Sequence, residues 1–137
     1  MAINIGGQGQ FVDVFHRFRG TARETSGNVS EIFDNTIYKK CVQILGGNGA
    51  TNFIHFPASE MSKKGIGLKG QYLYFECKAV PPPSQTYSIH IEALMDQYFI
   101  SRISLGNIYI LPKNNGISLS LPLILQPMKW TVVFLTK

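Results

Sequence analysis

The chain has 137 residues, enough for one domain with a buried core. Apolar residues make up 45% of it and charged residues only 15%, which excludes a disordered chain and a solvated coiled coil. Thirteen Lys and Arg against eight Asp and Glu give a net charge of +5, which favours an acidic partner: a protein, a nucleic acid or an anionic membrane.

The first half of the chain predicts one core-covering segment, one hairpin and one helical turn. Apolar residues at 11, 12, 14, 15 and 18 come closer to a helical stripe than to alternation, and a covering segment of either type fits them. Alternation predicts a strand over 37–45 and a returning strand over 52–56. The glycine-rich turn at 46–49 joins them, so these two strands are predicted to pair as a hairpin. A single helical turn is predicted over 59–65, with Ser59 as its cap and Gly65 as its left-handed stop.

The second half predicts strands over 71–80, 86–95, 98–104, 117–125 and 130–136, with turns at 96–97 and 113–116. Three prolines at 81–83 predict a stiff, extended connection. Many short strands separated by turns indicate an all-β fold. We expect a mainly antiparallel β-sandwich or jelly roll, with at most short helical turns.

Period-two alternation also predicts which side chains are buried. In the strand over 71–80, we expect Leu73, Phe75 and Cys77 to face the core, while Glu76 and Lys78 face water or a partner. Two isoleucines of the next strand, Ile89 and Ile91, should join the same core. The single tryptophan, Trp130, is interpreted as a core anchor, and Cys41 and Cys77 as buried free thiols.

The motifs of catalysis and metal binding are missing from the sequence. His16, His55 and His90 are too far apart for a short-range metal motif, and no paired cysteines follow His90-Ile91-Glu92 as a zinc deaminase would require. The 46–49 turn leads into a strand and lacks the Lys-Ser/Thr ending of a phosphate loop. No Gly-x-Ser-x-Gly elbow is present. We therefore expect no enzyme, no metal and no cofactor.

Basic and aromatic residues supply the candidate binding groups. The basic candidates fall into three clusters: Arg17, Arg19 and Arg23; Lys39 and Lys40; Lys63, Lys64 and Lys69. Such runs are often only a solvated face; the functional alternative is that one or two clusters meet an acidic surface. The pair Lys63 and Lys64 is predicted to matter most, because a turn presents both side chains outward. Tyrosines 72, 74 and 87 are candidates for stacking on a sugar or a single-stranded nucleic acid.

Several segments resemble, in order, one known domain family. They are Phe11-Val12-Asp13-Val14-Phe15-His16-Arg17-Phe18, Val29-Ser30-Glu31-Ile32-Phe33-Asp34, Gly65-Ile66-Gly67-Leu68, Gly70-Gln71-Tyr72-Leu73-Tyr74, Ile89-His90-Ile91, Pro122-Leu123 and Lys129-Trp130. The chain resembles the domain of the ciliary inner-junction protein family, which is found as a small axonemal protein and as the N-terminal module of a centriolar WD-repeat protein. The match is closer to the second branch. No single segment is specific; the ordered set across nearly the whole chain carries the resemblance.

The resemblance implies a structural β-sandwich, spanning 1–137 as one domain, that binds tubulin and neighbouring proteins at the inner junction between tubules. It implies a location on the cytoskeleton of the cytoplasm, in an axoneme, centriole or basal body, and neither nucleic acid nor membrane as a partner. Family members continue beyond the point where this chain stops, so we expect either a domain truncated at its C-terminus or a last strand that pairs differently. The alternative from the residues alone is a sandwich that binds carbohydrate or nucleic acid.

Overall fold

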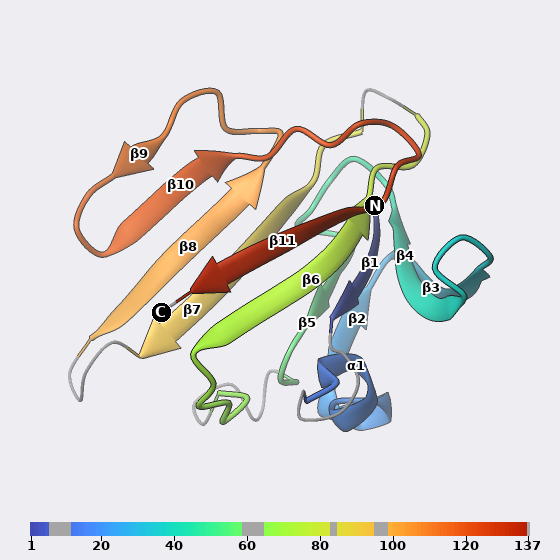
Figure 1. Cartoon of the computed structure of the whole chain (residues 1–137), viewed down its shortest axis with the longest axis horizontal. Coiled ribbons are helices and arrows are strands. Elements are labelled where there is room, and N and C mark those ends of the chain that lie inside the picture. Colours follow the sequence, from blue (N-terminus) through green and yellow to red (C-terminus); the bar gives the residue numbers. More distant parts are fainter. Residues whose placement is uncertain (6–11, 59–64, 83–84, 95–98, 137) are drawn as a thin grey trace.

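Two β-sheets lie face to face in the computed structural model, with the hydrophobic core between them (Figure 1). The structure describes residues 1–5, 12–58, 65–82, 85–94 and 99–136. Its elements are β1 (Ala2–Ile5), α1 (Val14–Arg17), the 3₁₀ helix η1 (Gly20–Ala22), β2 (Glu24–Ser26), β3 (Asn28–Asp34), β4 (Lys39–Leu45), β5 (Phe53–His55), β6 (Tyr72–Lys78), β7 (Ser88–Leu94), β8 (Ile100–Gly106), β9 (Lys113–Asn114), β10 (Ser118–Pro122) and β11 (Thr131–Thr136). The predicted all-β fold with only short helical pieces is confirmed.

The larger sheet has five strands in the order β11-β6-β1-β4-β3, and every neighbouring pair in it is antiparallel. The second sheet has the order β7-β8-β10-β9, with β8 and β10 parallel and the other pairs antiparallel. A small third sheet pairs β2 with β5. The sheets are therefore mainly antiparallel, as the short turns of the sequence predict.

The core is built from alternate residues of facing strands. Phe75 and Cys77 of β6 are 1% and 0% exposed, and they lie in one cluster with Ile3, Val42 and, from the second sheet, Leu105. Ile89 and Ile91 pack against this cluster. The predicted inward positions of Phe75, Cys77, Ile89 and Ile91 are therefore correct, because alternation along a strand places every second side chain on the same face. Leu73, predicted with them, is only half-buried and does not belong to the cluster.

The predicted hairpin between 37–45 and 52–56 is wrong. Strand β4 pairs with β1 on one side and β3 on the other, whereas β5 pairs with β2. Consecutive residues Cys41 and Val42 are both buried, so β4 is covered on both faces and lies inside the sheet. The glycine-rich turn at 46–49 passes the chain to another sheet instead of reversing it onto β4. The true hairpin joins β3 to β4 through residues 35–38.

Two further expectations are wrong on the face of β6 that points away from the core. Lys78 is buried, not open to water, because it forms an ion pair with the buried Asp34. Trp130 is only half-buried and lies beside Lys78, outside the core cluster. A small cluster of buried polar side chains therefore lies on this face of the sheet.

The remaining local expectations have mixed outcomes. The helical stripe near the start becomes α1, with Asp13 as its cap. Gly65 has the left-handed φ of +62° expected at a helix stop, but the helical turn predicted before it and the turn at 96–97 lie outside the described residues. The predicted turn at 113–116 includes the two-residue strand β9. None of the helices in the described part of the chain is long and apolar enough to cross a membrane.

Candidate interaction surface

Sheet topology gathers basic residues from distant parts of the sequence at one end of the five-stranded sheet. Because β1 runs antiparallel to both β4 and β6, the end of β1 lies near the start of β4 and level with the middle of β6, where Ile5 pairs with Phe75; the chain leading into β6 extends beyond that end. The segment that follows β1 carries Arg17 and Arg19, β4 begins with Lys39 and Lys40, and the loop before β6 carries Lys69. We call the exposed residues Arg17, Arg19, Lys40 and Lys69 the basic end.

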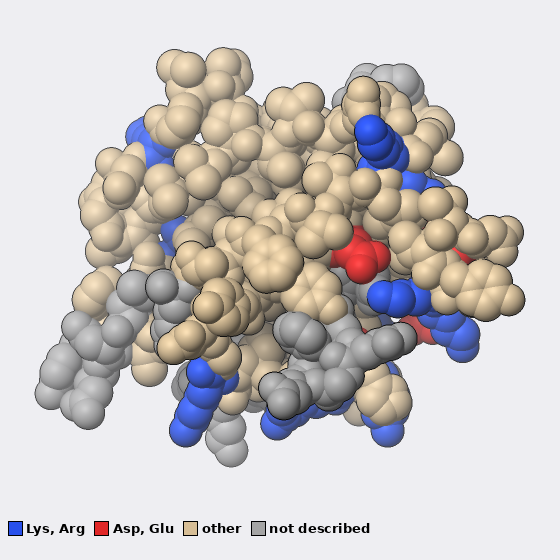
Figure 2. Space-filling view, viewed as in Figure 1, with Lys and Arg blue, Asp and Glu red and all other residues tan. Residues whose placement is uncertain are grey.

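Figure 2 shows Lys and Arg atoms along the lower edge of the molecule, where α1 and the chain leading into β6 lie in Figure 1. Among the described residues, none of the four side chains of the basic end forms an ion pair with a carboxylate. Their charge is therefore available to a partner.

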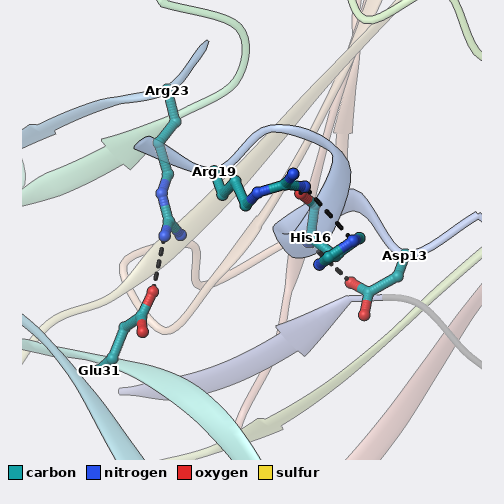
Figure 3. A network of polar contacts seen from close by, with 5 residues as sticks. All are labelled: Asp13, His16, Arg19, Arg23 and Glu31. Atoms are coloured by element: carbon teal, nitrogen blue, oxygen red, sulfur yellow. Dashed lines mark hydrogen bonds and ion pairs between the residues drawn. The ribbon is translucent and has the colours of Figure 1, made fainter. Parts of the chain in front are cut away.

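Packing and hydrogen bonds fix the arginines of the basic end in place. Val14 and Phe18 are buried, so α1 turns its other side, with Arg17, to solvent. The Asp13 carboxylate accepts from the backbone N–H of His16 at 3.2 Å. The Arg19 guanidinium donates to the His16 carbonyl at 2.8 Å and lies 3.3 Å from the His16 ring nitrogen Nε2 (Figure 3).

The other predicted basic residues differ in how available they are. Arg23 is half-buried and forms a 2.7 Å ion pair with Glu31 (Figure 3), and Lys39 lies 3.8 Å from Glu76. Both charges are therefore partly balanced within the domain. The predicted candidates Lys63 and Lys64 lie outside the described residues.

A buried ion pair that the sequence did not predict joins the end of β3 to the end of β6. Lys78 Nζ donates to Asp34 Oδ2 at 2.7 Å, and the two side chains are only 10% and 8% exposed. The Lys78 ammonium, helped by the backbone N–H groups of Thr36 and Ile37, holds the pKa of Asp34 at about 2 although burial opposes this. The Asp-Asn-Thr sequence is a turn signal that favours the local contacts, but no local pattern indicates Lys78 as the partner.

The three candidate tyrosines do not form one stacking surface. The Tyr87 hydroxyl donates to the Leu123 carbonyl and accepts from the Leu125 N–H, and its ring packs against the core. Tyr72 and Tyr74 lie on the face of β6 that points away from the core. There Tyr74 stacks on Phe134, with ring centroids 5.6 Å apart. This separation gives the carbohydrate or nucleic-acid alternative no structural support.

The histidines and cysteines occupy structural positions. His90 lies between the Ser88 and Ser104 hydroxyls, and burial lowers its pKa. His55 contacts the Pro57 carbonyl through Nδ1. Cys41 and Cys77 are buried free thiols, as predicted. Within the described ranges, no three His, Cys, Asp or Glu side chains cluster as metal ligands would.

The fold and this surface define a class: an all-β sandwich domain with a group of exposed basic residues at one end of a sheet. The model of the CFA20 domain matches residues 7–136, and the chain belongs to the CFA20 domain family.

Curated relatives agree with this family. The chain is 35% identical over 103 residues to Centriole proteome protein 16 of Chlamydomonas reinhardtii, a match that covers 72% of this chain and 5% of that protein. It is 30% identical over 128 residues to WD repeat-containing protein 90 of Xenopus tropicalis, covering 91% of this chain and 7% of that protein. The mouse protein of the same name is 27% identical over 122 residues, covering 87% and 6%.

The chain thus spans only 5–7% of the length of these relatives. The resemblance stated from the sequence is confirmed: the chain belongs to the CFA20 domain family, and its relatives include a centriole proteome protein and WD repeat-containing protein 90.

Proposed function

We propose that this domain is a structural microtubule-binding module of centrioles or cilia, which works by binding and not by turnover. It binds the acidic surface of tubulin through the basic end and contacts neighbouring proteins at the inner junction between tubules. The location at this junction rests on the family resemblance. The charge arrangement supports the tubulin contact.

The observation that carries the proposal is the convergence of cations that form no ion pair with any carboxylate in the described part of the chain. Residues 17, 19, 40 and 69 come from three segments that are far apart in sequence, yet the antiparallel arrangement of β1, β4 and β6 places them toward one end of the sheet. A fixed patch of one sign attracts an oppositely charged surface and orients it during encounter. The centriolar name of one relative agrees with such a partner.

Co-sedimentation with microtubules at increasing salt tests this proposal. Binding should weaken as salt rises, because exposed charges are screened over about 8 Å at physiological ionic strength. Arg17→Glu with Arg19→Glu, or Lys40→Glu with Lys69→Glu, should raise the Kd about tenfold, because each exposed pair contributes up to about 1 kcal/mol. Reversal of Lys63 and Lys64 should do the same if that predicted pair also faces tubulin.

A matched control reverses Lys113 and Lys129, two exposed lysines away from the basic end. Each double reversal changes the net charge by four, from +5 to +1, so a general charge effect would weaken all variants equally. Thermal unfolding should stay within about 0.5 kcal/mol of wild type for every variant. Unchanged binding of folded variants would refute the basic end as the contact. A wild-type domain that ignores microtubules and binds a glycan or single-stranded RNA would favour the alternative class.

A further inference from the structure

Two large aromatic side chains lie on the surface where β3 turns into β4, one near the end of β3 and one in the turn itself. Tyr38 is 78% exposed and Phe33 is 52% exposed, and their rings meet edge to face with centroids 5.2 Å apart. Figure 1 shows this turn projecting from the side of the five-stranded sheet. We call Phe33 and Tyr38 the aromatic turn. Exposed aromatic residues in contact with each other make a patch of the kind that marks an interaction site.

The backbone at Tyr38 does not fit the residue that occupies it. Tyr38 has φ of +57°, in the left-handed region that glycine and asparagine adopt far more readily than an aromatic residue. The turn could form with glycine or asparagine at position 38, so folding does not require an aromatic ring there. Strained positions of this type concentrate at functional sites, where the side chain serves a purpose other than folding.

The Asp34 carboxylate holds the turn through hydrogen bonds to its backbone. Asp34 Oδ1 accepts from the backbone N–H groups of Thr36 at 2.8 Å and Ile37 at 3.3 Å. The other oxygen of the same carboxylate binds the buried Lys78 ammonium, which ties the turn to the end of β6, three strands away from β3 in the sheet. A side chain presented in a fixed position loses little conformational entropy on binding, so this arrangement favours tight contact.

Positive charge borders the two rings. Lys39 and Lys40 follow Tyr38 directly in the chain, and Phe33 lies opposite Lys40 in the β3–β4 register. Lys40 is exposed and belongs to the basic end. Two rings beside a cation complement an apolar pocket with carboxylates at its rim, and tyrosine is among the residues that most often dominate binding energy.

We propose that the aromatic turn is the anchor with which this domain enters an apolar pocket on an acidic protein surface, here the microtubule wall. The inference rests on the proposed function and deepens it: the basic end steers the encounter, and Tyr38 supplies the short-range contact.

Replacing Tyr38 by glycine separates binding from folding. Because glycine adopts positive φ without strain, the Tyr38→Gly variant should unfold at the same temperature as wild type or higher. Its affinity for microtubules should fall by about tenfold or more, as expected for an interface anchor. Tyr38→Asn, which also tolerates this backbone, should behave alike. A purely structural tyrosine would show the opposite pattern, with lower stability and unchanged affinity.

Ile110 provides the control, since it is 88% exposed but lies between β8 and β9, beside the second sheet and away from both the turn and the basic end. Ile110→Ala should bind as wild type does. A benzophenone amino acid at position 38 should crosslink to tubulin, and one at position 110 should not. Wild-type affinity of folded Tyr38→Gly or Tyr38→Asn, while charge reversals at the basic end still weaken binding, would overturn this inference alone. A wild-type domain that never pellets with microtubules would overturn both proposals.

Discussion

Removing one partner of the buried Asp34–Lys78 ion pair should destabilise the domain more than removing both. Methionine is close to lysine in length and has no charge, so Lys78→Met leaves the Asp34 carboxylate buried without its cation. The two side chains are 8% and 10% exposed, so little water reaches the carboxylate that remains. Breaking a buried pair in this way costs about 3–5 kcal/mol.

The second substitution, Asp34→Asn, should restore most of that loss. Asparagine keeps a side-chain oxygen that can accept from the Thr36 and Ile37 N–H groups, but it carries no charge. The double variant therefore buries no unpaired charge and should lie within about 1 kcal/mol of wild type, since neutral replacements of buried pairs are often tolerated. At about 4 °C per kcal/mol for a domain of this size, Lys78→Met should melt about 12–20 °C lower.

Urea and thermal unfolding of the wild type, both single variants and the double variant would give the coupling energy. The two single losses should sum to much more than the loss of the double variant. Additive losses, or a Lys78→Met variant that loses less than about 1 kcal/mol, would refute the buried pair and mean that both charges are effectively solvated.

Three further predictions concern the core, pH and the thiols. Phe75→Ala should cost about 3–5 kcal/mol in urea unfolding because the ring is fully buried, and a loss below about 1 kcal/mol would place it at the surface. The pKa of Asp34 is about 2 in the folded domain and 3.8 when unperturbed, so its stabilisation is complete above about pH 4 and is lost as pH falls toward 2. Melting curves at pH 6, 4 and 3 should show this loss, and Lys78→Met should show less of it. Burial raises the pKa of the Cys41 thiol, and it raises the pKa of the Cys77 thiol to about 11. Neither thiol should therefore react with a maleimide at neutral pH until the domain is denatured. Rapid reaction of the native protein would contradict this prediction.

Local patterns in the sequence predicted the strands and their inward faces well. In β6 and β7, apolar and polar residues alternate, and the side chains at Phe75 and Ile89 lie toward the core as that pattern requires. The apolar spacing near Val14 and Phe18 likewise produced a short helix with both residues buried. Alternation and helical spacing act over a few neighbouring residues, so they can be recognised without the rest of the chain.

The same local signals failed where the outcome depended on distant residues. The glycines at 46–49 do make the chain turn, but a turn does not determine which strand lies beside the next one. Strand β4 is covered on both faces. Its two edges form hydrogen bonds with β1 and β3, whereas a hairpin with β5 would satisfy the backbone groups of one edge only. Strand order therefore followed from burial of the whole sheet and not from the loop.

The amino-acid sequence by itself determined the kinds of residue that carry the proposed contact: arginines and lysines in three clusters, and a tyrosine beside two of the lysines. Tertiary structure decided which of those charges are balanced within the described part of the domain. It balanced Arg23 with Glu31, brought Lys40 and Lys69 toward the end that carries Arg17, and buried Lys78 against Asp34. Charge is a property of each residue alone, whereas exposure and pairing depend on which strands come together. The Asp34–Lys78 contact, for example, joins residues 44 positions apart.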